Sequence, residues 1–201
     1  MSLVSNLFLL FVAASILIYY IVPRKSQWIV LLIFSYLYYI AGGPRYVVFI
    51  LFSTLVTWLM ALLIEKAEGK ENHKGARKLL ILGLILNFGM LGIVKYTNFA
   101  VENINALLHL NLRGIQLLLP LGISFYTFQS SGYLLDVYWK RCKAERHPLK
   151  YALFVSFFPQ ILQGPIGRYS RLADQLYAEH RFEGNNNCLL YTSPSPRDRQ
   201  K

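Results

Sequence analysis

The feature that most constrains this chain is a series of long apolar runs separated by short basic loops. A helix that crosses the hydrocarbon core of a membrane needs about 20 mostly apolar residues, and several of these runs approach that length. Only 15% of the 201 residues are charged, whereas a typical soluble domain carries roughly 25%. The pattern predicts an all-α, polytopic integral membrane protein and excludes a soluble globular fold.

The apolar runs predict about six transmembrane helices in this chain. These helices are expected at residues 3–22, 28–41, 46–64, 79–94, 115–138 and 151–162. Pro120 and Gly122 interrupt the fifth run, so its free backbone groups need partners from neighbouring helices or a cavity. Residues 98–112 place apolar side chains at helical spacing with polar ones between them, which predicts an amphipathic helix in the membrane interface.

The positive charges predict how the chain is oriented. Loops 23–27, 65–78 and 139–150 hold two, five and five Lys and Arg residues. With the N-terminus outside, all three loops face the cytoplasm, and only Arg45, Lys95 and Arg113 lie in loops on the other side. This asymmetry follows the positive-inside rule and predicts that the N-terminus lies outside.

Other classes of function find little support in the residues. The net charge of +11 is typical of nucleic-acid-binding proteins, but here the basic residues lie in short loops between apolar runs, so we expect no nucleic-acid partner. The two cysteines are too few for a disulfide scaffold. We find no metal-ligand spacing and no nucleotide-binding motif, so we expect neither a metal site nor a bound cofactor.

Polar side chains gather in the last two predicted spans and just beyond them. The candidates to line a substrate tunnel are Gln129, Ser130, Asp136, Gln160, Gln163 and Arg168. Such groups can bond one helix to another, or they can line a polar cavity that admits a hydrophilic substrate. The residues alone leave both interpretations open.

Two blocks of sequence give a more specific indication. Residues 120–129 read PLGISFYTFQ, residues 133–138 read YLLDVY, and residues 157–168 read FFPQILQGPIGR. Together they resemble the membrane-bound O-acyltransferase family, in the branch of the alginate O-acetyltransferase membrane subunits. The resemblance extends over residues 1–183 and implies the N-terminal part of a many-helix enzyme domain with a central tunnel.

The resemblance also implies an activity. Such an enzyme moves an acetyl group from a cytoplasmic thioester, such as acetyl-CoA, to hydroxyls of an exported polysaccharide such as alginate. Its expected partners are membrane lipid, the polysaccharide and periplasmic acetylation proteins. The alternative is a non-catalytic membrane component that exports a polysaccharide or a lipid through the same broken helices.

The family's essential histidine lies in a later, membrane-embedded segment. None of the histidines here, His73, His109, His147 and His180, falls inside a predicted span. No catalytic residue is therefore assigned, and we expect the 201-residue chain to be inactive by itself. Residues 184–201 are polar and rich in Pro and Ser. This tail resembles translated sequencing-adaptor read-through, and we expect it to be disordered and not native to the fold.

Overall fold

The computed structural model describes residues 6–108, 122–163 and 167–178 of the chain, and the elements within these ranges are all helical. In chain order they are α1 (Asn6–Ile21), a 3-10 turn η1 (Arg24–Ser26), α2 (Gln27–Gly42), α3 (Pro44–Glu68), α4 (His73–Leu108), α5 (Ile123–Tyr138), α6 (Pro148–Ser156), α7 (Phe158–Gln163) and α8 (Tyr169–Tyr177). The predicted all-α class is confirmed for this part of the chain.

Helix α3 is the centre of the bundle, because it packs against α2, α4, α5 and α6. Gly83 of α4 lies close to both α3 and α5. A Cβ atom at Gly83 of α4 would lie 2.9 Å from Leu134 Cδ1 of α5 and 3.3 Å from Met60 Cγ of α3. Ala61 and Ile64 of α3 are completely buried in the same core. Glycine at this position therefore lets α3, α4 and α5 pack closely against one another.

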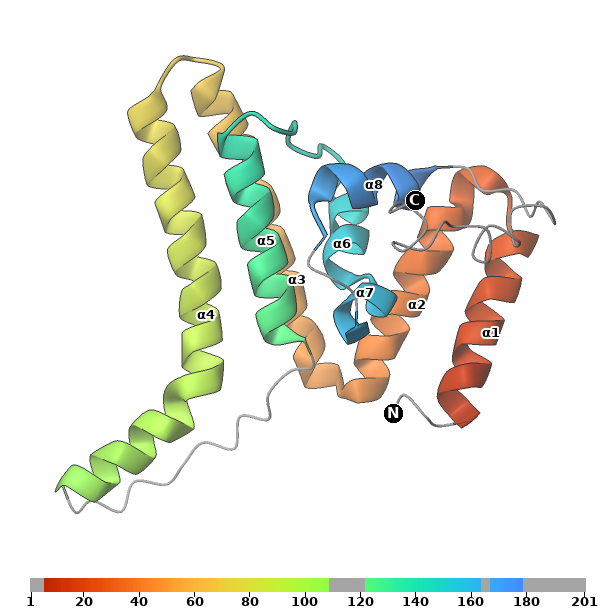
Figure 1. The fold of residues 1–201 in the computed structure, drawn as a ribbon, viewed down its shortest axis with the longest axis horizontal. Coiled ribbons are helices and arrows are strands. Elements are labelled where there is room, and N and C mark those ends of the chain that lie inside the picture. The colour runs from red at the N-terminus through yellow and green to blue at the C-terminus, as the bar shows by residue number, and fades with distance from the viewer. Residues whose placement is uncertain (1–5, 109–121, 164–166, 179–201) are drawn as a thin grey trace, which may run out of the picture.

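The three basic loops lie at one end of the bundle. Figure 1 shows the α1–α2, α3–α4 and α5–α6 connections at the top, with helix α8 beside them, and the α2–α3 turn at the bottom. Two contacts confirm this arrangement: Lys140 Nζ lies 3.2 Å from Glu68 Oε2, and the rings of Trp28 and His147 are 6.3 Å apart. The charge pattern predicted that these three loops lie on the same side of the bundle. That this side faces the cytoplasm stays a prediction.

Helix α4 differs from the expected pair of a span at 79–94 and a separate interfacial helix at 98–112. It is one helix of 36 residues that runs to Leu108, and Figure 1 shows that its last part bends away from the bundle. The Thr97 hydroxyl donates to the Ile93 carbonyl, and Asn103 Nδ2 donates to the Phe99 carbonyl at 2.7 Å. Side chains that bond back to the preceding turn bend a helix without ending it. Residues 109–112 lie outside the described part.

The last two predicted spans are shorter than expected. Helix α5 begins at Ile123, after Gly122 adopts a left-handed conformation with φ of 72°, so the predicted helix 115–138 is not continuous through Gly122. The run 151–162 is divided into α6 and α7 at Phe157, whose ψ is 101°. Pro159 explains this break, since it supplies no backbone N–H to Val155 in a continuous helix.

The number of spans is therefore not confirmed as six. Within the described residues, two stretches are long and apolar enough to cross a membrane, Val47–Glu68 and His73–Thr97. Helix α1 is apolar but has 16 residues. At 1.5 Å per residue this gives about 24 Å, less than the roughly 30 Å of a hydrocarbon core.

Candidate functional site

Helix α5 carries an unusual number of buried polar side chains for an apolar bundle. Apart from Tyr133, whose hydroxyl accepts the Glu145 N–H, those that are at most 4% exposed are Tyr126, Thr127, Gln129, Ser130 and Ser131. Helix α6 packs against α5 and adds the completely buried Tyr151 and Ser156. We call these seven residues the polar seam. It includes Gln129 and Ser130, two of the residues that the sequence indicated.

The seam begins where the chain breaks between α6 and α7. In a continuous helix the Phe154 carbonyl would accept the N–H of Phe158, four residues later. The break removes that bond: Gln129 Nε2 donates to the Phe154 carbonyl at 3.1 Å, and the Phe158 N–H donates to Ser35 Oγ at 3.4 Å. Gln129 and Ser35 thus satisfy the backbone groups that the break exposes.

Most of the other polar atoms of the seam lack a hydrogen-bond partner. These are the hydroxyls of Tyr126, Thr127, Ser130, Ser131, Tyr151 and Ser156, together with Gln129 Oε1. The Tyr151 hydroxyl faces Ser130 and Thr57 without making a geometrically good bond to either. A buried polar group without a partner costs about 1–3 kcal/mol. Several such groups in one place are therefore well suited to bind a polar ligand.

The candidates beyond α6 occupy different places. Gln160 of α7 is 8% exposed, and its Nε2 lies 2.5 Å from where a Cβ atom on Gly167 would be. Arg168 precedes α8 and is exposed. Gln163 ends α7, and its side chain lies outside the described part. No described contact joins these residues to Gln129.

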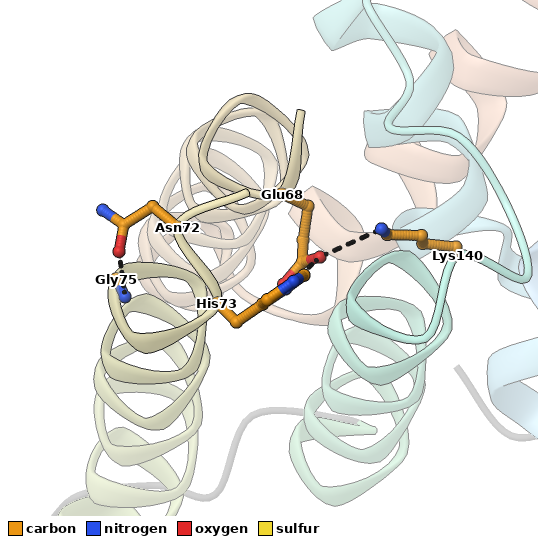
Figure 2. A network of polar contacts seen from close by, with 5 residues as sticks. All are labelled: Glu68, Asn72, His73, Gly75 and Lys140. Carbon is orange, nitrogen blue, oxygen red and sulfur yellow. Dashed lines mark hydrogen bonds and ion pairs between the residues drawn. The ribbon is translucent and has the colours of Figure 1, made fainter. Parts of the chain in front are cut away.

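Asp136 lies at the opposite end of α5 from Gly122, among the basic loops. Its carboxylate is 3.6 Å from Arg141 Nη1. Figure 2 shows the neighbouring contacts: Glu68 Oε2 lies 2.9 Å from His73 Nδ1 and 3.2 Å from Lys140 Nζ. Asp136 is seven helical steps after Gln129, about 10 Å along a helix. The role of Asp136 in a substrate path stays a prediction.

Loop 139–147 is held by Glu145, a residue that sequence reasoning missed. The Trp58 indole N–H donates to the Glu145 carbonyl at 2.8 Å, and the Glu145 N–H donates to the Tyr133 hydroxyl at 2.8 Å. The Tyr169 hydroxyl donates to Glu145 Oε2 at 2.6 Å. Glu145 therefore connects α3, α5 and α8. The spacing of the buried residues Tyr169, Ala173 and Leu176 is the signal that could have revealed α8 as an amphipathic helix.

A second buried network was also missed. The Ser53 hydroxyl donates to Asn87 Oδ1 at 2.7 Å, and Asn87 Nδ2 donates to Thr57 Oγ1 at 2.9 Å and to the Gly83 carbonyl at 3.0 Å. Asn87 is thus fully satisfied, in contrast with the polar seam. A single Asn inside the apolar run 79–94 was the available signal.

The described histidines lie at the basic end of the bundle and outside the seam. His73 pairs with Glu68, and His147 precedes α6 with its ring beside Trp28. His109 and His180 lie outside the described residues. Within the described ranges, no three His, Cys, Asp or Glu side chains come close enough together to hold a metal ion.

Comparison with known proteins gives several relatives. The chain is 36% identical over 178 residues to "Probable alginate O-acetylase AlgI" of Pseudomonas syringae, which covers 85% of this chain and 34% of the relative. It is 34% identical over 178 residues to the protein of the same name in Pseudomonas aeruginosa, and the match covers 85% of this chain and 34% of that relative. It is 33% identical over 187 residues to the "Peptidoglycan O-acetyltransferase" of Helicobacter pylori, with 81% and 33% covered.

No family model matches the chain, and no solved structure matches it significantly. The chain spans about a third of the length of the relatives it matches. The similarity nevertheless extends over most of this chain. Over most of its length the chain is therefore similar to proteins named alginate or peptidoglycan O-acetyltransferases, which agrees with the resemblance of its two sequence blocks to the membrane-bound O-acyltransferases.

Proposed function

We propose that this protein is a membrane O-acetyltransferase whose polar seam is part of the substrate path. The donor is a cytoplasmic thioester such as acetyl-CoA, and the acceptor is a hydroxyl of an exported polysaccharide such as alginate. The observation that carries the proposal is the seam itself, a group of buried hydroxyls without partners in a chain related to named polysaccharide O-acetyltransferases.

The chemistry requires a polar site that excludes water. The acceptor oxygen attacks the thioester carbonyl carbon, the carbon–sulfur bond breaks with the thiolate as leaving group, and the proton of the acceptor hydroxyl passes through a base to that thiolate. Water in the site would compete with the acceptor and hydrolyse the thioester. The seam's hydroxyls can donate or accept hydrogen bonds and Gln129 Oε1 can accept them, so together they can orient an acyl carbonyl or a sugar hydroxyl.

The membrane placement follows from the same proposal. The basic end, with Glu68, Lys140 and Glu145, faces the cytoplasm and the thioester, and the N-terminus faces outside. The polysaccharide then receives its acetyl group on the outer side of a bacterial inner membrane, where periplasmic acetylation proteins are the expected partners.

The test is Gln129→Leu, made in the complete gene product and assayed as acetyl on the exported polymer. We expect acetylation to fall about tenfold, equivalent to one lost hydrogen bond of roughly 1.4 kcal/mol. The amount of membrane-inserted protein should fall less than acetylation does, because the change removes one described hydrogen bond, the one to the Phe154 carbonyl.

Asn87→Leu is the matched control, because Asn87 is equally buried but fully bonded. Asn87→Leu leaves the hydroxyls of Ser53 and Thr57 without their hydrogen-bond partner. The amount of membrane-inserted protein and the acetylation of the polymer should therefore fall together. If Gln129→Leu behaves like Asn87→Leu, the seam is a structural contact between helices and has no place in the substrate path.

A further inference from the structure

A groove of about 580 Å³ lies between α2, α3 and α6, apart from the polar seam. Its lining is almost entirely apolar, and along α2 it extends from Leu32 to Ile40. The eight helical steps from Leu32 to Ile40 span about 12 Å. Leu37 and Leu55 line the groove and are 46% and 55% exposed, so one side of it is open. In the proposed membrane placement that open side meets hydrocarbon, and a recess of this length holds the part of an extended acyl chain nearest the headgroup.

One end of the groove lies at the basic end of the bundle. Trp58 lines that end, and its indole N–H is bonded to the Glu145 carbonyl of loop 139–147. Pro148 lines the same end. Arg146 is two residues before Pro148, which places their Cα atoms within about 7.6 Å of each other. The Arg146 side chain is 85% exposed, and its Nη2 is 3.5 Å from Glu65 Oε2, a long and weak ion pair.

The α2 side of the same end also carries positive charge. The ring of Trp28 is 6.3 Å from that of His147, so the start of α2 lies beside loop 139–147. Lys25, which is exposed, is three residues before Trp28, and Leu32 of the groove is one turn after it. Tryptophans with basic neighbours are typical of the level at which lipid headgroups lie.

We propose that this groove binds one acyl chain of an anionic phospholipid, with its phosphate between Arg146 and Lys25. Two features select this occupant. The apolar lining fits a hydrocarbon chain, and the cations at one end complement a headgroup with net negative charge, which guanidinium groups bind strongly. The groove is separate from the seam, so lipid binding and acetyl transfer can each fail without the other.

The experiment is native mass spectrometry of the full chain, purified in detergent and titrated with phosphatidylglycerol or phosphatidylcholine. We expect one phosphatidylglycerol per chain, retained in preference to phosphatidylcholine. Leu55→Trp fills the groove and should lower the bound fraction about fivefold or more, as loss of a buried apolar contact requires. Arg146→Ala should remove the preference for phosphatidylglycerol over phosphatidylcholine. It should leave the apolar groove around Leu55 intact, so an acyl chain can still bind there.

Ile81→Trp is the matched control, because Ile81 of α4 is 46% exposed and does not line the groove. It should bind lipid like the unaltered chain. Equal losses in Leu55→Trp and Ile81→Trp would overturn the proposal, as would equal retention of the two lipids by the unaltered chain. An unaltered chain that retains no lipid would also overturn it, and would indicate that another protein segment or a second copy fills the groove.

Discussion

Gly122 shows how one residue sets the start of α5. Its φ of 72° lies in the left-handed region, and a Cβ atom there would be 2.3 Å from Ile161 Cγ2. We therefore expect Gly122→Ala to lower the stability of the bundle by about 2 kcal/mol or more, through backbone strain and overpacking together. The measurement is the thermal unfolding of detergent-solubilised protein.

Gly132→Ala is the control within the same helix, since nothing lies within 4 Å of its Cβ position. It should leave the unfolding temperature unchanged or raise it, because alanine favours a helix interior. Equal unfolding temperatures for the two variants would show that Gly122 is not needed for the α5–α7 contact.

Cys142 is expected to be an unreactive thiol at neutral pH. Burial, with the nearby charges of Asp136 and Glu65, raises the pKa of Cys142 to about 11 from its ordinary 9.0. The thiolate is the species that reacts with maleimide. In a Cys188→Ser background, labelling of the folded protein at pH 7.5 should be about 100-fold slower than labelling in denaturant.

The raised pKa of Cys142 also predicts how stability and the labelling rate change with pH. The unfolded thiol ionises near pH 9 while the folded one keeps its proton until about pH 11, so the group's contribution to stability is present below pH 9 and is lost between these values. The labelling rate of the folded protein should climb until about pH 11. A plateau near pH 9 would show that Cys142 is in free contact with water.

At the scale of elements, α8 is expected to be fixed to the bundle mainly through Tyr169 and Glu145. Burial, then Tyr177 and the bond to Glu145, raise the pKa of Tyr169 above its ordinary value, so its hydroxyl remains a donor. We expect Tyr169→Phe to increase hydrogen exchange in α8 by roughly tenfold, as loss of a hydrogen bond to a charged group of about 1.5–3 kcal/mol requires. The rest of the bundle should exchange as before.

A double-mutant cycle checks this assignment. Glu145→Gln and Tyr169→Phe should together cost less than the sum of the two single changes, because both remove the same bond. Glu71→Gln, which changes an exposed carboxyl in the α3–α4 turn, serves as the control. Fully additive effects for Glu145 and Tyr169 would mean that the contact does not hold α8.

For the whole molecule, the expected orientation can be tested at the two ends of the bundle. Lys70 lies in the α3–α4 turn at the basic end, and Gly42 lies at the opposite end with open space around it. In a background without Cys142 and Cys188, Gly42→Cys should react with an impermeant maleimide in intact spheroplasts. Lys70→Cys should react only after the membrane is permeabilised. The reverse pattern would place the basic end outside and contradict the positive-inside assignment.

The sequence by itself determined the class of the molecule, the common end of its basic loops, and part of the candidate site. Apolar content, helical spacing and the placement of Lys and Arg are local properties that need no knowledge of the fold. The polar residues Gln129 and Ser130 were visible for the same reason, since they stand out in an apolar run. The two sequence blocks also indicated the family to which the relatives belong.

Only the tertiary structure decided which polar groups find partners. Ser35 and Gln129, which are distant in the chain, satisfy the backbone groups that the Pro159 break exposes between α6 and α7. Asn87 and Gln129 look alike in the sequence, yet only Asn87 is fully bonded. That difference depends on which helices meet, and a hydrogen bond between residues far apart in the chain leaves no local pattern to read.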